Sequence, residues 1–301
     1  MRRSSCFKIM LAIPVLAGLL AVVPGCPDKK PADGGKEEKK TAGDGKTPDG
    51  PGPKGKLEAL VGKSYDGIVK GKVTYDGTAP VMKELTAVNQ HADKETCHEG
   101  STKDPTWIVD KDGDVADVIV YLEAPKGKFL SVEEKLANGY KEGPWIDQPH
   151  CLYEPQTVAL FAGYKTADGK DHETGLKLMV RNTSTLSHNT KIVGDGRNNR
   201  DIFDENIKAG EKKGVPTPAW KYQKDTLSIG CTKHTWMTGT LKTFDHPFFA
   251  VTGKDGTFEI KNVPVGVEVT IKTWHKEAAD ADKTETFKAG DNSVEFKIKA
   301  K

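Results

Sequence analysis

The chain has 301 residues, and its 45 lysines and arginines nearly balance 43 aspartates and glutamates, which leaves a formal net charge of +2 at pH 7. Because acidic and basic residues are interspersed, the composition implies neither nucleic acid nor an acidic protein as a partner. Beyond residue 63, roughly 240 residues remain, enough for one large domain or two ordinary domains with real cores.

The N-terminus has the pattern of a secretory signal, which we predict over residues 1–25. A basic start is followed by an apolar run, Ile9–Val23, that is too short for a membrane span and ends just before Cys26. A cysteine directly after the cleavage point resembles the lipobox of bacterial lipoproteins, in which Cys26 would carry the lipid. The alternative is an ordinary signal peptide with an incidental cysteine.

Residues 26–63 are predicted to be the lipidated cysteine followed by a disordered tether. Lys, Asp, Glu, Gly and Pro dominate this segment, and large apolar residues occur only near its end. Such a segment buries too little apolar surface to offset the entropy lost on ordering it. We therefore expect an extracytoplasmic protein, periplasmic or at the cell surface, that its N-terminal lipid holds to a membrane.

The rest of the chain reads as short β-branched or alternating runs separated by Gly, Pro, Asn and Asp, a pattern typical of an all-β sandwich. A helical turn or two is expected only at Val132–Leu136. The predicted strands are Ile68–Tyr75, Val118–Leu122, Thr157–Phe161, Leu176–Val180, Leu227–Ile229, Gly239–Phe244, Thr257–Ile260, Val267–Ile271 and Val294–Ile298.

Three cysteines remain once Cys6 leaves with the signal and Cys26 carries the lipid. An odd number of cysteines in a secreted chain leaves one thiol unpaired or bound to a metal. Only Cys231 has His and Met at ligand spacing. We therefore predict a disulfide between Cys97 and Cys151 and leave the third thiol to a metal.

The stretch Cys-Thr-Lys-His-Thr-Trp-Met places the thiolate of Cys231, the imidazole of His234 and the thioether of Met237 within seven residues. A second isolated histidine, His188, lies upstream. Two His, one Cys and a weakly bound Met are the ligand set of a blue-copper electron-transfer centre. The sequence therefore predicts one type 1 copper ion.

The Cys-x-x-His-x-x-Met motif followed by Gly resembles cupredoxins, and its tight spacing is most similar to amicyanin. This resemblance covers about residues 149–244. It implies that His188, Cys231 and His234 are the equatorial copper ligands and that Met237 is the axial one.

The resemblance also implies roles for residues around the copper. Asn189, which follows the first histidine, and Thr232 would tie the two ligand segments together by hydrogen bonds and tune the thiolate. His234 would lie at the loop rim as the entry and exit point for electrons, and Trp236 would join an apolar docking patch around it. Thr235 departs from the proline of the amicyanin-like loop, which affects the loop's stiffness and removes no ligand.

Residues on both sides of this block suggest a second sandwich. Phe249–Gly266 and Gly71–Gly77 resemble two parts of the carboxypeptidase regulatory-like (transthyretin-like) repeat. The resemblance predicts one β module built from residues 64–148 and 245–301, with the cupredoxin domain inserted between them. Asp245–Gly253 resembles a sequence segment of planctomycete-type surface lipoproteins that combine the two domains.

Other uses of the same residues stay open. Cys231 could instead form a disulfide with Cys97 or Cys151, or the fold could be a cupredoxin that binds no metal. Cys97–His98 and His150–Cys151 could form a second, Cys2His2 metal site in place of the disulfide.

The prediction for function is an electron carrier and not an enzyme. The sequence has no His-x-His pair for an oxygen-reducing copper cluster, and no Gly-x-Ser-x-Gly, phosphate-loop or His-Glu-x-x-His motif. We expect single electrons to pass to an unidentified redox partner protein. The alternatives are a cell-surface β-sandwich module that binds carbohydrate or a protein, and a copper carrier.

Overall fold

The computed structural model describes residues 57–301. The predicted signal peptide, the lipidation site Cys26 and most of the predicted tether lie outside these residues, so the membrane anchor stays a prediction. Within the described part, no helix combines the length and apolar character needed to cross a membrane. The end of the predicted tether is ordered, because β1 (Glu58–Leu60) pairs in parallel with β4 (Lys128–Leu130) and buries Leu60.

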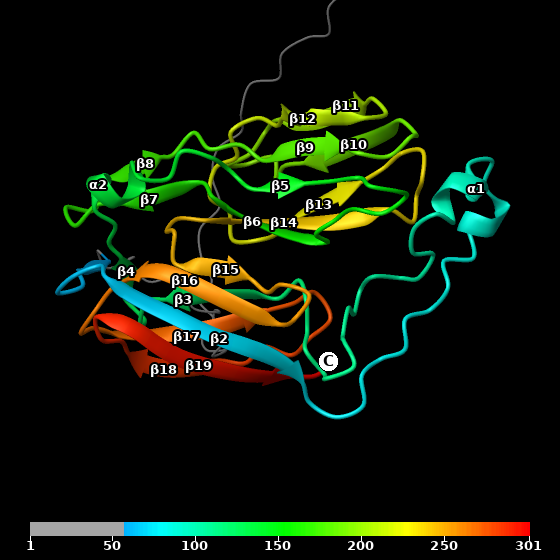
Figure 1. Ribbon diagram of the computed structural model, residues 1–301. Coiled ribbons are helices and arrows are strands. Elements are labelled where there is room, and N and C mark those ends of the chain that lie inside the picture. Colours follow the sequence, from blue (N-terminus) through cyan, green and yellow to red (C-terminus); the bar gives the residue numbers. More distant parts are fainter. Residues whose placement is uncertain (1–56) are drawn as a thin grey trace, which may run out of the picture. The chain divides into compact units, whose positions relative to one another are not determined.

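Strands account for almost all regular structure in the described residues, so the predicted all-β fold class is confirmed (Figure 1). The expected helical turn corresponds to α2 (Glu134–Ala137). Two further short helical segments, η1 (Val88–Gln90) and α1 (Lys94–Cys97), were not predicted.

Two sheets form from residues 145–244, the upper green and yellow part of Figure 1. Their strands are β5 (Trp145–Ile146), β6 (Thr157–Phe161), β9 (Met179–Asn182), β10 (His188–Val193), β11 (Ile202–Ile207), β12 (Glu211–Pro216), β13 (Leu227–Gly230) and β14 (Thr238–Phe244). One sheet has five strands in the order β11-β10-β13-β14-β6, and the other has three in the order β12-β9-β5. Apolar side chains from both sheets, including fully buried Leu160, Ile192 and Ile146, form one core. This core extends to the end of the sandwich that carries the candidate site, because Cys231 and Met237 belong to it.

The flanking parts of the chain form a second pair of sheets. Their strands are β2 (Gly67–Tyr75), β3 (Ile119–Glu123), β15 (Phe249–Val251), β16 (Thr257–Val263), β17 (Glu268–Trp274), β18 (Asp282–Thr286) and β19 (Gly290–Ile298). The sheet orders are β15-β3-β17-β18 and β16-β2-β19. Parallel pairing of β2 with β19 therefore joins the beginning and the end of the described chain in one sheet. The identity of these sheets as a carboxypeptidase regulatory-like module stays a prediction.

The close approach of β2 to β19 explains why Gly71, in the predicted Gly71–Gly77 segment, is a glycine. A Cβ atom on Gly71 would lie 1.7 Å from the carbonyl oxygen of Val294 and would also meet the ring of Phe258. Any larger residue would push the strands apart, so this position requires glycine.

The boundary between the two blocks lies earlier than residue 149. Trp145 and Ile146 of β5 pair with Met179 and Val180 of β9, so they belong to the sheets of the middle block. A strand of two residues has no periodicity that sequence reasoning could detect. A small separate hairpin, β7 (Gly163–Lys165) with β8 (Asp171–Glu173), follows β6.

Between β2 and β3 the chain makes a long excursion, cyan in Figure 1, that carries η1 and α1. Its base is closed by an antiparallel bridge between Glu84 and Lys103 and by the hydrogen bond from Leu85 N–H to the Thr102 carbonyl, 2.8 Å. We call residues 83–104 the cover segment, because it lies against the candidate site described next.

Candidate metal centre

A short loop joins β13 to β14 and carries three of the predicted ligands. Gly230 and Thr238 face each other as the last antiparallel pair, so Cys231 through Met237 must turn within the loop. The N–H of Cys231 donates to the carbonyl of Met237 at 3.2 Å, and the N–H of Met237 donates to the carbonyl of His234 at 2.8 Å. These two backbone hydrogen bonds cross the short loop and hold it in one conformation.

His188 reaches this loop from a neighbouring strand. It is the first residue of β10, and β10 pairs with β13 through Lys191–Gly230 and Ile192–Ile229. Antiparallel pairing next to the loop brings the start of β10 beside Cys231, although the two residues are far apart in sequence. The sequence led us to expect His188 at the end of an earlier strand across the sandwich; the structure instead places it on β10, which lies next to β13 in the same sheet.

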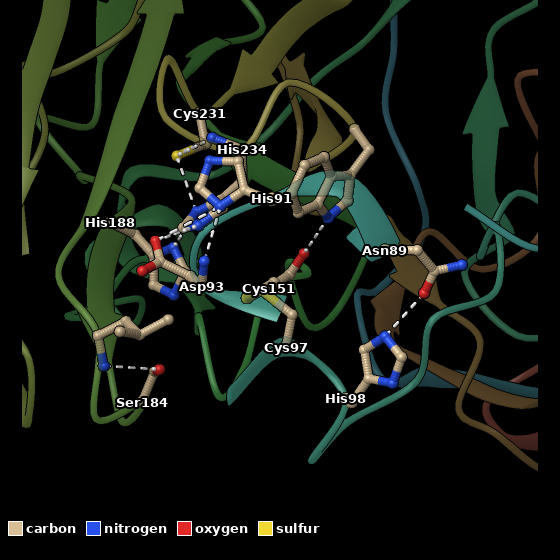
Figure 2. Close-up of a disulfide and its surroundings, with 12 residues drawn as sticks. Asn89, His91, Asp93, Cys97, His98, Cys151, Ser184, His188, Cys231 and His234 are labelled. Atoms are coloured by element: carbon tan, nitrogen blue, oxygen red, sulfur yellow. Dashed lines mark hydrogen bonds and ion pairs between the residues drawn. A yellow bond between two sulfur atoms is a disulfide. The ribbon is translucent and has the colours of Figure 1, made fainter. Parts of the chain in front are cut away.

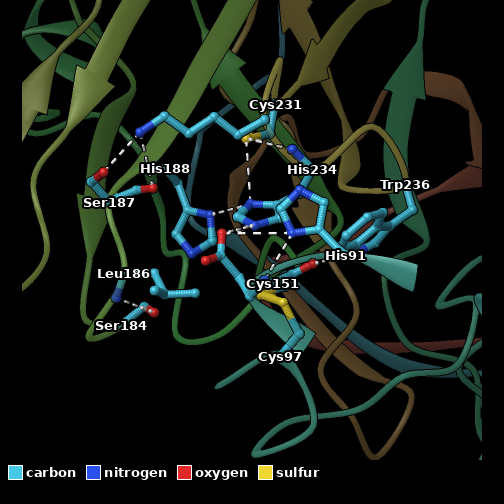
Figure 3. Close-up of polar contacts among 12 residues, drawn as sticks. His91, Cys97, Cys151, Ser184, Leu186, Ser187, His188, Cys231, His234 and Trp236 are labelled. Atoms are coloured by element: carbon cyan, nitrogen blue, oxygen red, sulfur yellow. Dashed lines mark hydrogen bonds and ion pairs between the residues drawn. A yellow bond between two sulfur atoms is a disulfide. The ribbon is translucent and has the colours of Figure 1, made fainter. Parts of the chain in front are cut away.

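The ligand atoms converge, as Figure 3 shows. Nδ1 of His188 lies 3.0 Å from Nδ1 of His234, and Sγ of Cys231 lies 3.9 Å from the same His234 nitrogen. The backbone N–H of His234 also points to the sulfur, at 3.5 Å. The structure thus brings together His188, Cys231 and His234, and it buries Met237 in the adjoining core.

The cluster is closed to water. His188, His234 and Met237 are 0% exposed and Cys231 is 5% exposed. Burial raises the pKa of the Cys231 thiol, but hydrogen bonds from the two histidines and from backbone N–H groups outweigh it and lower this pKa to about 5. A pocket that favours the thiolate at neutral pH is one prepared for a metal cation.

The thiol of Cys231 is available, because it is the free cysteine of the described residues. Cys97 and Cys151 form the predicted disulfide. Two alternatives left open by the sequence are therefore not what the structure shows: Cys231 is bonded to neither Cys97 nor Cys151, and those two sulfurs are joined to each other and not part of a Cys2His2 site.

Hydrogen bonds link the two ligand-bearing segments. The side-chain oxygen of Asn189 accepts from the Thr232 N–H at 3.3 Å, which is the contact expected for this pair. Tyr153 was not among the predicted residues, although it is fully buried and its hydroxyl lies 3.1 Å from the Asn189 carbonyl and 3.0 Å from the Gly230 carbonyl. The one available signal was its position two residues after Cys151, at the start of the middle block.

The cover segment closes the remaining side of the cluster (Figure 2). Oδ2 of Asp93 lies 3.1 Å from Nε2 of His234, and the His91 ring lies 4.7 Å from the His234 ring, centroid to centroid. The disulfide sulfurs also lie within 4.8 Å of a His234 ring nitrogen. Neither Asp93 nor His91 was predicted.

This cover changes the expectation for electron exchange. His234 was expected at an exposed rim, yet it is 0% exposed because His91 and Asp93 lie over it. Trp236, expected in an apolar docking patch, is half-buried and donates its Nε1–H to the Cys151 carbonyl at 3.1 Å. His234 therefore offers no exposed edge to a partner in this structure.

The donor set fits copper. Two imidazole nitrogens 3.0 Å apart can both lie about 2 Å from one ion, the usual metal–imidazole distance. Thiolate and thioether donors select copper among first-row metals when they are combined with imidazole in this way. His188, Cys231, His234 and Met237 are the residues that would hold it.

No model of a known protein family matches the chain, and no curated protein matches it. Among solved structures, it is similar to a purple cupredoxin from Nitrosopumilus maritimus, with 13% identity, a TM-score of 0.25 and coverage of 34% of this chain and 99% of that one. It is also similar to a reduced, Cu(I) form of an amicyanin variant, with 15% identity, a TM-score of 0.25 and coverage of 36% and 89%. Likeness at this level carries no argument about function, which therefore rests on the site.

Proposed function

We propose that the chain binds one copper ion through His188, Cys231, His234 and Met237, and that it transfers single electrons. The observation that carries the proposal is the convergence of two Nδ1 atoms and one free thiol in a buried pocket. When bound, copper would supply a reversible one-electron step between Cu(I) and Cu(II).

Burial of the donors favours electron transfer over catalysis. All four are at most 5% exposed, so the residues exclude water and leave a substrate no approach to the metal. The stiff ligand loop and the hydrogen bond between Asn189 and Thr232 hold the donors in one arrangement. Fixed donors suit both oxidation states, and a small rearrangement is what fast electron transfer requires.

Titration of the purified chain with Cu(II) tests the proposal. One equivalent should produce the intense visible band of a thiolate–Cu(II) bond, and Cys231→Ser and His188→Gln should abolish it. His98→Gln is the matched control, because His98 is exposed and only pairs with Asn89. A wild-type chain that stays colourless with a free thiol would refute the proposal.

Redox cycling separates a shuttle from a carrier. A shuttle keeps its copper through repeated reduction and oxidation in the presence of a Cu(I) chelator, whereas a carrier loses it after the first reduction. Burial of the ligands leads us to expect retention.

The predicted lipid at Cys26 would place this centre next to a membrane, where a redox partner could reach it. Mass spectrometry of the N-terminal peptide of the mature protein tests that anchor. An unmodified Cys26 within an uncleaved or differently cleaved chain would remove the anchor and leave the copper proposal intact.

A further inference from the structure

The cover segment approaches one ligand, His234, and does so through a charged side chain. Asp93 directly precedes α1, whose last residue, Cys97, is held to Cys151 by the disulfide. On the other side of the disulfide, the Cys151 carbonyl accepts from Trp236 Nε1–H, two residues after His234. The segment that carries Asp93 is therefore tied to the ligand loop through the Cys97–Cys151 disulfide and the hydrogen bond between Trp236 and Cys151.

The two nitrogens of His234 have different surroundings. Nδ1 faces Nδ1 of His188 at 3.0 Å and the sulfur of Cys231 at 3.9 Å, whereas Nε2 faces Oδ2 of Asp93 at 3.1 Å. An ionised carboxylate only accepts hydrogen bonds, so Nε2 must carry the proton in this contact. This arrangement directs Nδ1 toward the metal cluster.

The other histidine lacks such support. Nε2 of His188 is one of two buried side-chain atoms without a hydrogen-bond partner among residues 57–301. The asymmetry means that the orientation of His188 depends on packing, whereas that of His234 is set by a specific charged partner.

We propose that Asp93 is the positioning residue of the metal ligand His234, and that the Cys97–Cys151 disulfide holds it in place. The inference rests on the proposed function for the identity of the metal. A carboxylate that accepts from the remote N–H of a ligating imidazole fixes its tautomer and ring orientation and makes the imidazole a stronger donor. A stronger donor with a negative charge behind it stabilises Cu(II) more than Cu(I).

A second metal ion on His91, Asp93 and His234 is the competing explanation, because their ligand atoms lie within 4.8 Å of one another. Against it, Nδ1 of His91 accepts the backbone N–H of Asp93 at 3.2 Å. In addition, Nδ1 of His234 faces His188 and Cys231, so a second ion on its Nε2 would require an imidazolate shared between two metals. The Asp93 carboxylate is likewise engaged by His234. We therefore assign this group to support of the ligand.

The expected magnitude follows from the exposure of Asp93. Loss of such a partner usually weakens metal binding by about 10–100-fold. Because the Asp93 side chain is 38% exposed, solvent screens it, and we expect the lower end of this range. A tenfold loss for Cu(II) alone corresponds to a rise of about 59 mV in a one-electron midpoint potential.

The test compares Asp93→Ala and Asp93→Asn with Glu95→Gln in the full chain. Glu95 is exposed and lies two residues away, so its variant removes the same charge without the contact. Copper-loaded Asp93→Ala should bind Cu(II) about tenfold more weakly and show the higher potential. Asp93→Asn, whose amide oxygen still accepts, should show a smaller rise, and Glu95→Gln should match the wild type.

A second measurement uses the metal-free chain, so it decides the inference whether or not copper binds. In ¹⁵N-labelled protein, the ring Nε2–H of His234 should give a slowly exchanging signal that survives in Asp93→Asn and disappears in Asp93→Ala. A wild-type protein that takes up no copper would refute the proposed function but not the contact between Asp93 and His234. Three results would overturn the inference. The first is a signal that persists in Asp93→Ala, and the second is an equal potential in Asp93→Ala and Glu95→Gln. The third is two bound metal ions per chain that Asp93→Ala reduces to one.

Discussion

Removal of the Cys97–Cys151 disulfide should cost about 4 kcal/mol of unfolding free energy. The cross-link closes a loop with a sequence separation of 54 residues. In the chain-entropy treatment, a loop of that length removes about 14 cal/mol/K from the unfolded state, which is about 4 kcal/mol at room temperature. This is a large share of the 5–15 kcal/mol that typically separates folded from unfolded proteins.

The double variant Cys97→Ala/Cys151→Ala tests this value by guanidinium unfolding followed through tryptophan fluorescence. Alanine is preferable to serine because both positions are at most 3% exposed, and a buried hydroxyl without a partner is costly. Wild-type protein with a reduced disulfide is the control that keeps both sulfurs and loses only the link. A loss below about 1 kcal/mol in both samples would refute the reasoning, because the link would then constrain little of the unfolded chain.

Three further predictions concern single residues. In the metal-free chain, the ultraviolet absorbance of the Cys231 thiolate should be present at pH 7 and vanish as the pH falls through about 5, whereas an ordinary thiol titrates at about 8.5. A transition near the ordinary value would contradict the hydrogen bonds described. Gly71→Ala should destabilise the flanking sheets by several kcal/mol or prevent folding, because its Cβ would lie 1.7 Å from the Val294 oxygen; circular dichroism and thermal unfolding measure this, and a wild-type melting curve would disprove it. Tyr153→Phe should cost about 1–2 kcal/mol, because it removes a buried hydroxyl shared by the two ligand-bearing strands; chemical denaturation measures the loss, and an unchanged midpoint would show that the hydroxyl holds neither strand.

Much of the fold was predictable because its signals are local. The strand predicted at Thr157–Phe161 has those bounds in the structure, and that predicted at Leu227–Ile229 extends by one residue. Alternating or β-branched runs carry their own period, and turn residues mark their ends. The ligand loop was equally visible, since three donors lie within seven residues between two such runs.

Strands without a strong apolar period were missed. β10 begins with His188-Asn-Thr-Lys, and β12 contains the run Glu211-Lys-Lys-Gly, so polar residues dominate both. Their pairing with β13 and β9 respectively is decided by tertiary contacts and not by local preference. A strand end was therefore predicted for His188, but its place next to β13 in the same sheet could not be derived from the sequence.

The supporting residues of the cover segment were missed for a related reason. Asp93 lies 141 residues before His234 in sequence, and nothing near either residue indicates the contact. One signal was present: the predicted Cys97–Cys151 pairing ties the residues around Cys97 to the start of the middle block. A disulfide that crosses between two parts of a chain constrains its neighbours as well as its cysteines, so Asp93 and His91 could have been considered as neighbours of the metal site.

Under the proposed function, a redox partner would not meet His234 itself, because the cover segment lies over this ligand. The His234 ring contacts the rings of His91, at 4.7 Å, and Trp236, at 5.2 Å, and these two rings lie 5.3 Å from each other. The His91 side chain is 31% exposed, so it links the buried ligand to the surface, and Trp236 is also partly exposed. Under the proposed function, an electron that leaves through His234 would pass to His91 of the cover segment or to Trp236 of the ligand loop. The segment proposed to position the ligand would then also form part of the surface that a partner approaches.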